Sequence, residues 1–196
     1  MKSSLTKDAF IDAAFKIART KGLGNLSARS LAKELSCSTM PIYSYLKSMK
    51  NLHKELKKKA VNLLLAYQTT PRTGRIFFDM GIGYILFAKQ ERHLFRFLYA
   101  GKEGEKRYPA TEKRMRKFAF ESLIQNMKGD PILGGLDEQT LKGVLIKMWI
   151  FVHGLAFLIN NNSFANDGEE YVVETIKEMG LLLIQGEKSS KEAQSK

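Results

Sequence analysis

The sequence contains little cysteine, little proline and no clear β-strand pattern. Only one cysteine and four prolines occur among its 196 residues. The single cysteine, Cys37, excludes an internal disulfide framework and fits a reducing compartment, so we expect a cytoplasmic protein. Alternation of apolar and polar residues, the signature of a half-buried strand, never exceeds four residues without a better helical interpretation. The absence of a strand pattern predicts an all-α fold.

The positive charge of the chain is concentrated in its first third. The net charge is +12. Residues 1–70 carry 13 Lys and Arg against 4 Asp and Glu, a balance of +9, whereas residues 71–196 carry 19 against 16. A basic surface attracts a polyanion, most simply nucleic acid. A lysine-rich solvated surface is the alternative, but the clustering favours nucleic acid.

Apolar residues recur with the 3.6-residue period of a helix along most of the chain and predict about nine helices. The expected helices cover residues 6–21, two short segments between 27 and 46, and then 49–68, 74–89, 91–99, 110–128, 137–161 and 169–185. We divide the chain into an N-terminal three-helix domain over residues 1–50, a larger helical domain over residues 51–188 and a flexible tail over residues 189–196.

One long apolar segment invites a transmembrane interpretation. Residues 143–159 are interrupted only by Lys147 and His153. This segment is at the short limit for a membrane span, carries a lysine and stands alone in the sequence. A helix that is apolar on nearly all sides is more often buried within a protein. We therefore expect a core helix and no membrane association.

Residues 27–52 have the pattern of two short helices joined by a tight turn. Leu31 and Leu35 give the first helix an apolar side, and residues 36–38 interrupt the pattern. Ser38 can cap the second helix, and Pro41 falls in its first turn, where a missing N–H costs nothing. Helices this short are unstable alone, so a scaffold must hold them with one face free. This is the arrangement of a helix-turn-helix DNA-binding motif.

This N-terminal pattern resembles that of the TetR family of bacterial transcriptional regulators. The family's second helix has the form Ser/Thr-x-Arg-x-Leu/Ile-Ala-x-x-Leu-Gly-Val-Ser, its third ends Leu-Tyr-x-His-Phe, and Ser-Lys follows. The matching segments here are Ser27 to Ser38, Ile42 to Leu46 and Ser48. Ser36 replaces the turn glycine, and Met49 replaces the lysine.

The resemblance covers residues 6–60, and beyond them it rests on one short pattern. Trp149, His153 and Gly154 are similar to the Trp…His-Gly signature of one group of TetR C-terminal domains. The resemblance implies an N-terminal helix-turn-helix DNA-binding domain followed by a helical effector-binding and dimerisation domain.

The side chains of the motif suit the major groove of DNA. Arg29, the only arginine of the motif and of the helix after it, fits guanine bidentately, although a salt bridge to Glu34 or Glu55 is the alternative. Met40 and Pro41 suit thymine methyl groups, and the tyrosines suit phosphates. The candidate DNA-binding residues are Ser27, Arg29, Ser38, Thr39, Met40, Pro41, Tyr43, Ser44, Tyr45, Lys47, Ser48 and Lys50.

The pattern of reactive residues argues against an enzyme. The three histidines, His53, His93 and His153, have no metal-binding spacing, and Cys37 lies in the turn of the motif. No glycine-rich phosphate loop follows a strand. We expect no catalytic residues, no metal site and no cofactor.

Aromatic residues are frequent in the C-terminal half, and a packed helical core accounts for most of them. The resemblance implies that some line a cavity for a small, mostly apolar effector. The candidate effector-binding residues are Tyr84, Phe87, Phe120, Trp149 and His153.

The last two predicted helices have apolar faces that fit a homodimer. A two-fold dimer matches a palindromic DNA operator, and two helices from each chain make a four-helix bundle. The candidate dimerisation residues are Val144, Ile150, Leu155, Leu158, Val172, Val173, Ile176, Met179 and Leu183.

These observations together predict a homodimeric transcriptional repressor that is released from a palindromic DNA operator by a small effector. Two alternatives remain. One is an architectural DNA-binding protein without an effector. The other is a helical enzyme or membrane-associated protein in which the match to the motif is accidental.

Overall fold

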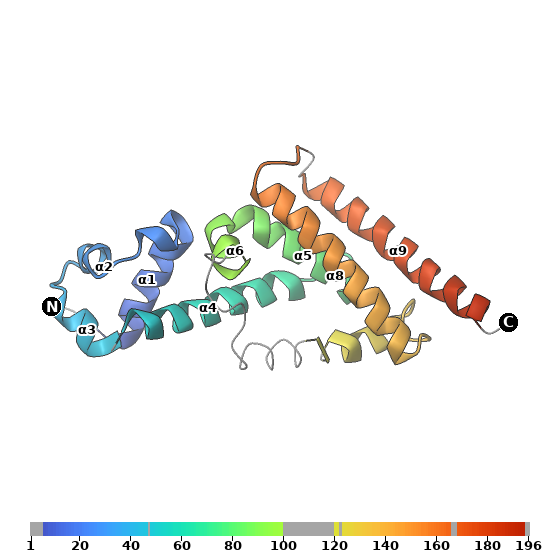
Figure 1. The fold of residues 1–196 in the computed structure, drawn as a ribbon, viewed down its shortest axis with the longest axis horizontal. Coiled ribbons are helices and arrows are strands. Elements are labelled where there is room, and N and C mark those ends of the chain that lie inside the picture. Colours follow the sequence, from blue (N-terminus) through green and yellow to red (C-terminus); the bar gives the residue numbers. More distant parts are fainter. Residues whose placement is uncertain (1–5, 47, 100–119, 122, 166–167, 195–196) are drawn as a thin grey trace. The chain divides into compact units, whose positions relative to one another are not determined.

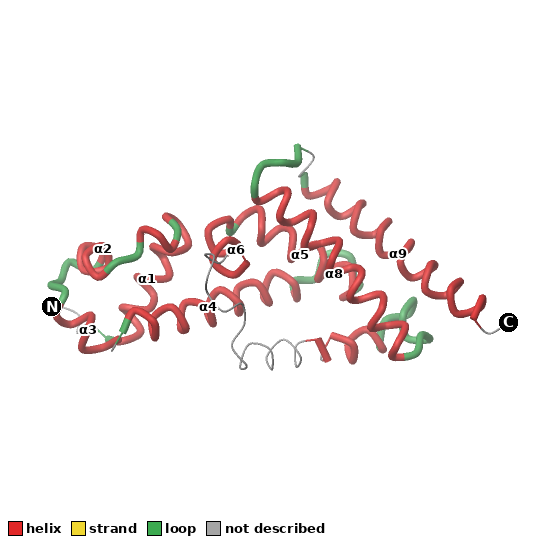
Figure 2. Tube along the Cα trace, in the orientation of Figure 1, coloured by secondary structure: helices red, strands yellow, loops and turns green. Residues whose placement is uncertain are grey.

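The computed structural model describes residues 6–46, 48–99, 120–121, 123–165 and 168–194. All regular secondary structure in these ranges is helical (Figure 2). The elements, labelled in Figure 1, are α1 (Lys7–Lys21), the 3-10 helix η1 (Leu23–Asn25), α2 (Ala28–Glu34), α3 (Met40–Leu46), α4 (Met49–Thr69), α5 (Ile76–Gln90), α6 (Arg92–Tyr99), α8 (Glu138–Asn160) and α9 (Glu169–Gln194). The predicted all-α class is confirmed.

The helix expected over residues 110–128 is seen only in part. Residues 120–121 and 123–128 are helical, and the helix ends at residue 128 as expected. Its first ten residues lie outside the described ranges.

The chain folds as two compact units. The first comprises residues 1–65 and 91–101, and the second comprises residues 66–90 and 102–196. The first unit contains α1, α2, α3, most of α4 and α6, and the second contains α5, α8 and α9. These bounds differ from the sequence-based division at residue 50, because most of α4 belongs to the first unit and the chain returns to that unit in α6.

Helix α1 is the scaffold of the first unit. The hydroxyl of Thr6 caps it by accepting a hydrogen bond from Ala9 N at 3.2 Å. The apolar stripe expected from the helical period is buried, with Phe10 and Ala14 fully covered and Ile17 only 2% exposed. Leu31 of α2 and Ile42 of α3 are buried in the same unit, at 0% and 1% exposure. The short helices are therefore held by packing rather than by their own stability.

An ion pair joins α6 to α1. Glu91, the residue before α6, is 5% exposed, and its carboxylate accepts hydrogen bonds from Nε of Arg19 at 2.7 Å and from Nη2 of the same guanidinium. Next to it, the ring of His93 lies against Gly22, where an added Cβ would be 3.1 Å from Nδ1. A bidentate arginine–carboxylate pair is a strong and directional contact. It fixes the start of α6 to the end of α1.

Helix α5 is the central helix of the second unit. Residues 77–88 are all buried. A Cβ at Gly83 would lie 2.1 Å from the carbonyl oxygen of Tyr67, so the backbones of α4 and α5 touch at this position. A glycine inside a helix lowers helix propensity but lets another backbone approach closely. The structure shows that Gly83 permits close packing.

Helix α8 is the apolar segment for which a transmembrane interpretation was considered. Among the described helices it alone is long and apolar enough to cross a membrane, with a mean hydropathy of 1.7 over an 18-residue window that is 44% buried within the protein. It lies against α5 and α9 in the second unit (Figure 1). Asp137 caps it, accepting from Gln139 N and Thr140 N, and Asn160 Nδ2 at its end donates to the carbonyl of Ala88. These contacts are typical of a core helix.

Two helix ends differ from the sequence-based expectation. Helix α9 continues to Gln194, so the residues expected to form a flexible tail are helical almost to the end of the chain. No proline or glycine follows Gly186, and the Lys, Glu, Ala and Gln there are good helix formers. Helix α3 begins at Met40, so Thr39 rather than Ser38 directly precedes it.

Candidate nucleic-acid interface

Helix α2 begins at a reciprocal cap. Ser27 Oγ accepts a hydrogen bond from Ser30 N at 3.0 Å, and Ser30 Oγ accepts one from Ser27 N at 2.8 Å. This capping box stabilises a helix of only seven residues. Leu31 and Ala32 are buried, which leaves Arg29 exposed on another side of the helix.

The two acids considered as partners for Arg29 are paired with lysines instead. Glu34 is 2.8 Å from Nζ of Lys16, and Glu55 is 3.2 Å from Nζ of Lys58. The hydrogen bond from Lys16 lowers the pKa of Glu34 and, from the same contact, raises the pKa of Lys16. Within the described part of the chain, Arg29 makes no ion pair, so its guanidinium is available to an anionic or base-edge partner.

The turn between α2 and α3 uses a left-handed residue. Ser36 has a φ of 51°, although it is not a glycine. The turn is closed by a hydrogen bond from Cys37 N to the carbonyl of Ala32 at 3.0 Å. This is the position at which TetR-like sequences carry glycine, which adopts such a φ without a steric cost. The serine therefore keeps the turn geometry with some backbone strain.

Helix α3 presents a strongly exposed face. Ile42 is 1% exposed and anchors the helix, whereas Met40 is 80% exposed and Tyr43 is 58% exposed. The ring of Tyr45 lies 5.4 Å from that of Phe10, so Tyr45 is partly occupied in holding α3 on α1. Large apolar groups are costly to leave in water, so a face of this kind is expected to meet a partner.

The start of α4 adds a second set of donors. Ser48 Oγ accepts a hydrogen bond from Asn51 N at 3.2 Å, which caps the helix, and Lys50 is exposed. Lys47, also a candidate, lies outside the described residues. Lysine in a first helical turn opposes the helix dipole, and a bound phosphate removes that penalty.

The first unit brings most of the candidate DNA-binding residues together. They lie on α2, on α3 and at the beginning of α4. The side chains that are exposed are those of Ser27, Arg29, Ser38, Thr39, Met40, Tyr43, Ser44, Tyr45 and Lys50, and those that are half-buried are Pro41 and Ser48. This exposed surface is called the reading face below.

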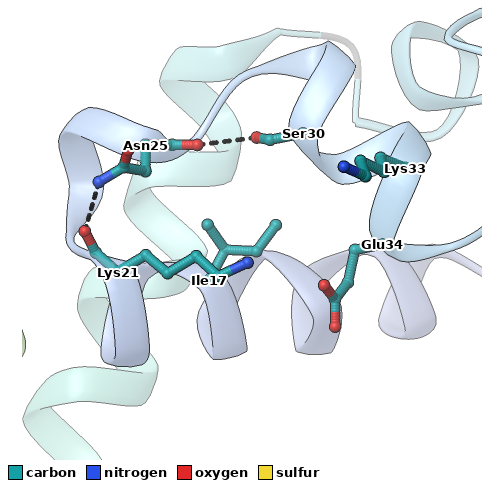
Figure 3. Close-up of a pocket in the computed structure, with 6 residues that line it drawn as sticks. All are labelled: Ile17, Lys21, Asn25, Ser30, Lys33 and Glu34. Atoms are coloured by element: carbon teal, nitrogen blue, oxygen red, sulfur yellow. Dashed lines mark hydrogen bonds between the residues drawn. The ribbon is translucent and has the colours of Figure 1, made fainter.

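A polar groove of about 280 Å³ lies between α1 and α2 (Figure 3). Its polar groups are largely bonded within the chain, since Asn25 Nδ2 donates to the carbonyl of Lys21 and Ser30 Oγ donates to the carbonyl of Asn25 at 2.8 Å. The sequence did not point to this groove. The residues lining it are Ile17, Lys21, Asn25, Ser30, Lys33 and Glu34. It offers exposed ammonium groups and no enclosed cavity.

Three of the candidate effector-binding residues form one cluster in the second unit. The hydroxyl of Tyr84 is 2.7 Å from Nδ1 of His153, and the Trp149 ring stacks on the His153 ring with 5.6 Å between centroids. Tyr84 is 3% exposed and Trp149 is 49% exposed. Burial lowers the pKa of His153, so the neutral imidazole is favoured. The cluster thus runs from the core to the surface.

The other two candidate effector-binding residues take no part in the hydrogen bond and ring stacking of this cluster. Phe87 is fully buried and packs edge-on against Tyr67, with 5.6 Å between ring centroids. Phe120 is half-buried. No ring contact between either of them and the Tyr84 cluster is found in the described ranges. These ranges also contain no group of three or more His, Cys, Asp or Glu arranged to hold a metal ion.

Four of the nine candidate dimerisation residues belong to the core of the chain itself. Val144, Val172 and Ile176 have 0% exposure, and Leu155 has 8%. Assigning them to a dimer surface was wrong, because they face the other helices of the second unit. Val173, Met179 and Leu183 are half-buried, while Ile150 is 60% exposed and Leu158 is 44% exposed.

Other apolar residues of α8 and α9 are exposed and were missed. Because α8 is apolar on nearly all sides, its periodicity did not show which face is covered. The large exposed apolar side chains of the two helices are Ile146, Trp149, Ile150, Phe157, Leu158, Tyr171, Leu181 and Leu182. This set, without Trp149, which stacks on His153 in the cluster described above, is called the outer stripe below. Exposed apolar surface of this extent is typical of a protein–protein contact.

Two solved structures that are similar to this chain are described as transcriptional regulators. A TetR-like transcriptional regulator from Rhodococcus sp. RHA1 aligns with a TM-score of 0.58 at 13% identity, covering 88% of this chain and 91% of that one. A putative TetR-family transcriptional regulator from Rhodococcus sp. aligns with a TM-score of 0.60 at 13% identity, covering 91% and 98%. The chain therefore has a TetR-like regulator fold. No protein-family model and no curated protein sequence matches it.

Proposed function

We propose that this protein is a transcriptional repressor that binds a palindromic DNA operator as a homodimer and is released by a small, mostly apolar effector. The observation that carries the proposal is the reading face. On one unit with a basic sequence, it combines an exposed α3, a lysine at a helix start and an arginine that makes no ion pair with any described residue. That is the combination that groove and phosphate contacts require.

DNA binding is tested first. The full-length protein is used to select duplexes from a random pool, and Kd is then measured by fluorescence anisotropy over a range of salt concentrations. Arg29→Ala is expected to weaken binding to the selected duplex by about 10-fold or more, because each good base contact contributes about 1–3 kcal/mol. Lys50→Ala is expected to weaken binding on all sequences and to reduce the salt slope by about 1.

A matched control accompanies these variants. Lys142→Ala removes an exposed cation that is paired with Glu138 on α8, outside the reading face. It is expected to leave both Kd and its salt dependence close to wild type. Equal losses in Lys142→Ala and Arg29→Ala would show that the chain attracts DNA only through its net charge.

The dimer is assigned to the outer stripe of α8 and α9. A two-fold dimer places the same surface of each copy against the other and matches a palindromic operator. Ile150→Glu and Leu182→Glu put a charge on side chains that are 60% and 55% exposed, so folding is expected to survive. Sedimentation equilibrium should show monomers for both and a dimer for Asn62→Glu, which alters an exposed position on α4. A dimeric Ile150→Glu protein contradicts the assignment.

The effector is assigned to the Tyr84, Trp149 and His153 cluster, with Phe87 and Phe120 as further candidates. Trp149 is the only tryptophan of the chain and is half-exposed, so its fluorescence reports directly on a ligand placed against it. A ligand that binds the DNA-free state about 100-fold more tightly than the DNA-bound state shifts the free-energy difference between these states by roughly 2.7 kcal/mol, within the usual range of allosteric coupling. Trp149→Ala is expected to abolish release by the effector while leaving operator affinity unchanged.

A search for the effector distinguishes a ligand-controlled repressor from an architectural DNA-binding protein without an effector. If no compound of an apolar library alters both Trp149 fluorescence and operator affinity, the architectural protein without an effector is the better description. A repressor of this kind acts on DNA in the cytoplasm, and its mechanism requires that operator DNA and effector weaken each other's binding by the same factor.

A further inference from the structure

The outward side of α3 is unusual in what it lacks. Residues 38–46 contain no Arg, Lys, Asn, Gln, Asp or Glu. These are the side chains that discriminate bases in the major groove, by bidentate contact to guanine or adenine or by accepting from cytosine N4. If α3 enters the major groove, it must therefore recognise bases by another kind of contact.

Two kinds of group remain on this helix. The hydroxyls of Tyr43 and Ser44 can each donate or accept, so they bond to several bases or to phosphate and discriminate weakly. The apolar side chains of Pro41 and Met40 are the other kind. Pro41 is half-buried, whereas Met40 at 80% exposure is the most exposed large apolar side chain found in the described structure. The methyl group of thymine is the one apolar feature that a base pair presents in the major groove.

Resting on the proposed DNA-binding function, we infer that Met40 is a specificity-determining residue that packs on a thymine methyl in each operator half-site. Met40 lies in the first turn of α3, at the end of the helix nearest the turn, and Ile42 at 1% exposure fixes the helix beneath it. Its flexible, unbranched side chain adapts to a methyl group without demanding one hydrogen-bond geometry. Arg29 is the only arginine of α2 and α3, and its planar guanidinium fits guanine bidentately.

Replacement of thymine by uracil isolates this contact, because uracil differs only by the missing methyl group. Burial of one such group contributes about fourfold in affinity. Each thymine of the selected operator is replaced in turn by dU, in one half-site at a time, and Kd is measured by anisotropy for the full-length protein. One position per half-site is expected to weaken the wild type about fourfold.

Variants of Met40 identify the residue that senses the methyl. Met40→Ala is expected to bind thymine and uracil operators equally, whereas Met40→Leu, which keeps an apolar tip, is expected to retain most of the difference. Tyr43→Phe is the matched control on the same face and is expected to retain the full fourfold difference. Because Met40 is 80% exposed, none of its variants removes a core contact.

The outcomes separate this inference from the proposed function. If the protein selects an operator but no thymine-to-uracil change matters, or if Met40→Ala keeps the fourfold penalty, the role of Met40 is wrong while DNA recognition stands. If no duplex is selected and binding shows no sequence preference, the proposed function fails as well.

Discussion

The contact between Gly83 and Tyr67 predicts that Gly83→Ala lowers the stability of the protein, whereas helix propensity alone predicts that it raises it. Gly83 lies inside α5, where alanine is intrinsically preferred over glycine by about 1 kcal/mol. However, a Cβ there would be 2.1 Å from the Tyr67 carbonyl oxygen and 2.7 Å from the Cα of Gln68, whereas ordinary contacts begin at 3.4 Å. The obstacle is backbone, so no side chain can rotate out of the way.

Gly83→Ala must therefore separate α4 from α5 by more than an ångström. Overpacking costs about 1–3 kcal/mol where side chains can adjust. We expect the upper end of this range, with a net loss of about 3 kcal/mol in the free energy of unfolding and a Tm lower by about 6–12 °C. Urea unfolding followed by circular dichroism at 222 nm measures the change.

Gly186→Ala is the matched control for this substitution. Gly186 is also inside a helix, α9, but nothing lies within 4 Å of its added Cβ. It is expected to raise the free energy of unfolding by up to about 1 kcal/mol. If Gly83→Ala is as stable as Gly186→Ala, the close approach of α4 and α5 is refuted.

Three further predictions concern the first unit and the cluster in the second. Ser36→Gly relieves the strain of the left-handed φ and is expected to raise the free energy of unfolding by about 0.5–1 kcal/mol, measured by urea titration. A lower free energy of unfolding would instead show that the serine side chain stabilises the turn. Arg19→Ala leaves the buried Glu91 carboxylate without its guanidinium and is expected to lower the free energy of unfolding by about 3 kcal/mol. Lys16→Ala, which breaks an exposed pair on the same helix, should lower it far less. Similar losses for the two variants in thermal unfolding would contradict the role of burial. Burial lowers the pKa of His153, so the unfolded chain binds a proton first as the pH falls below about 6.5, and stability is lost between that pH and the lower pKa of the folded state. His153→Gln should remove this loss of stability at low pH. Parallel profiles of stability against pH from 7.5 to 5 for the variant and the wild type would disprove the role of His153.

The features that the sequence predicted well are those set by short-range chemistry. The starts of the helices near residues 27 and 137, where Ser27 and Asp137 cap α2 and α8, and the burial of Leu31 each depend on residues within a few positions of one another. Capping and helical periodicity operate over that range. The reading face could therefore be described in terms of Arg29 and its neighbours from the sequence alone.

The features that the sequence could not predict depend on pairs that are distant along the chain. Arg19 meets Glu91, and Tyr84 meets His153, across 72 and 69 residues. No local pattern fixes such a partner, and Glu34 and Glu55 were equally plausible partners for Arg29 until both were found paired with lysines. The first of these pairs joins α6 to α1, and the return of the chain to the first unit in α6 could not be derived from local patterns.

The apolar sequence of α8 predicts where this helix lies along the chain but not which of its sides is buried. The helical period of apolar residues identifies the buried side only when the other side is polar, and here both sides carry large apolar residues. Val144 and Ile150 look alike in the sequence, yet one is fully buried and the other is 60% exposed. Leaving Ile150 and Leu158 in water carries a cost in free energy, which a second copy can remove by covering them. The same property that concealed the orientation of α8 is thus the reason to expect a dimer through its outer stripe.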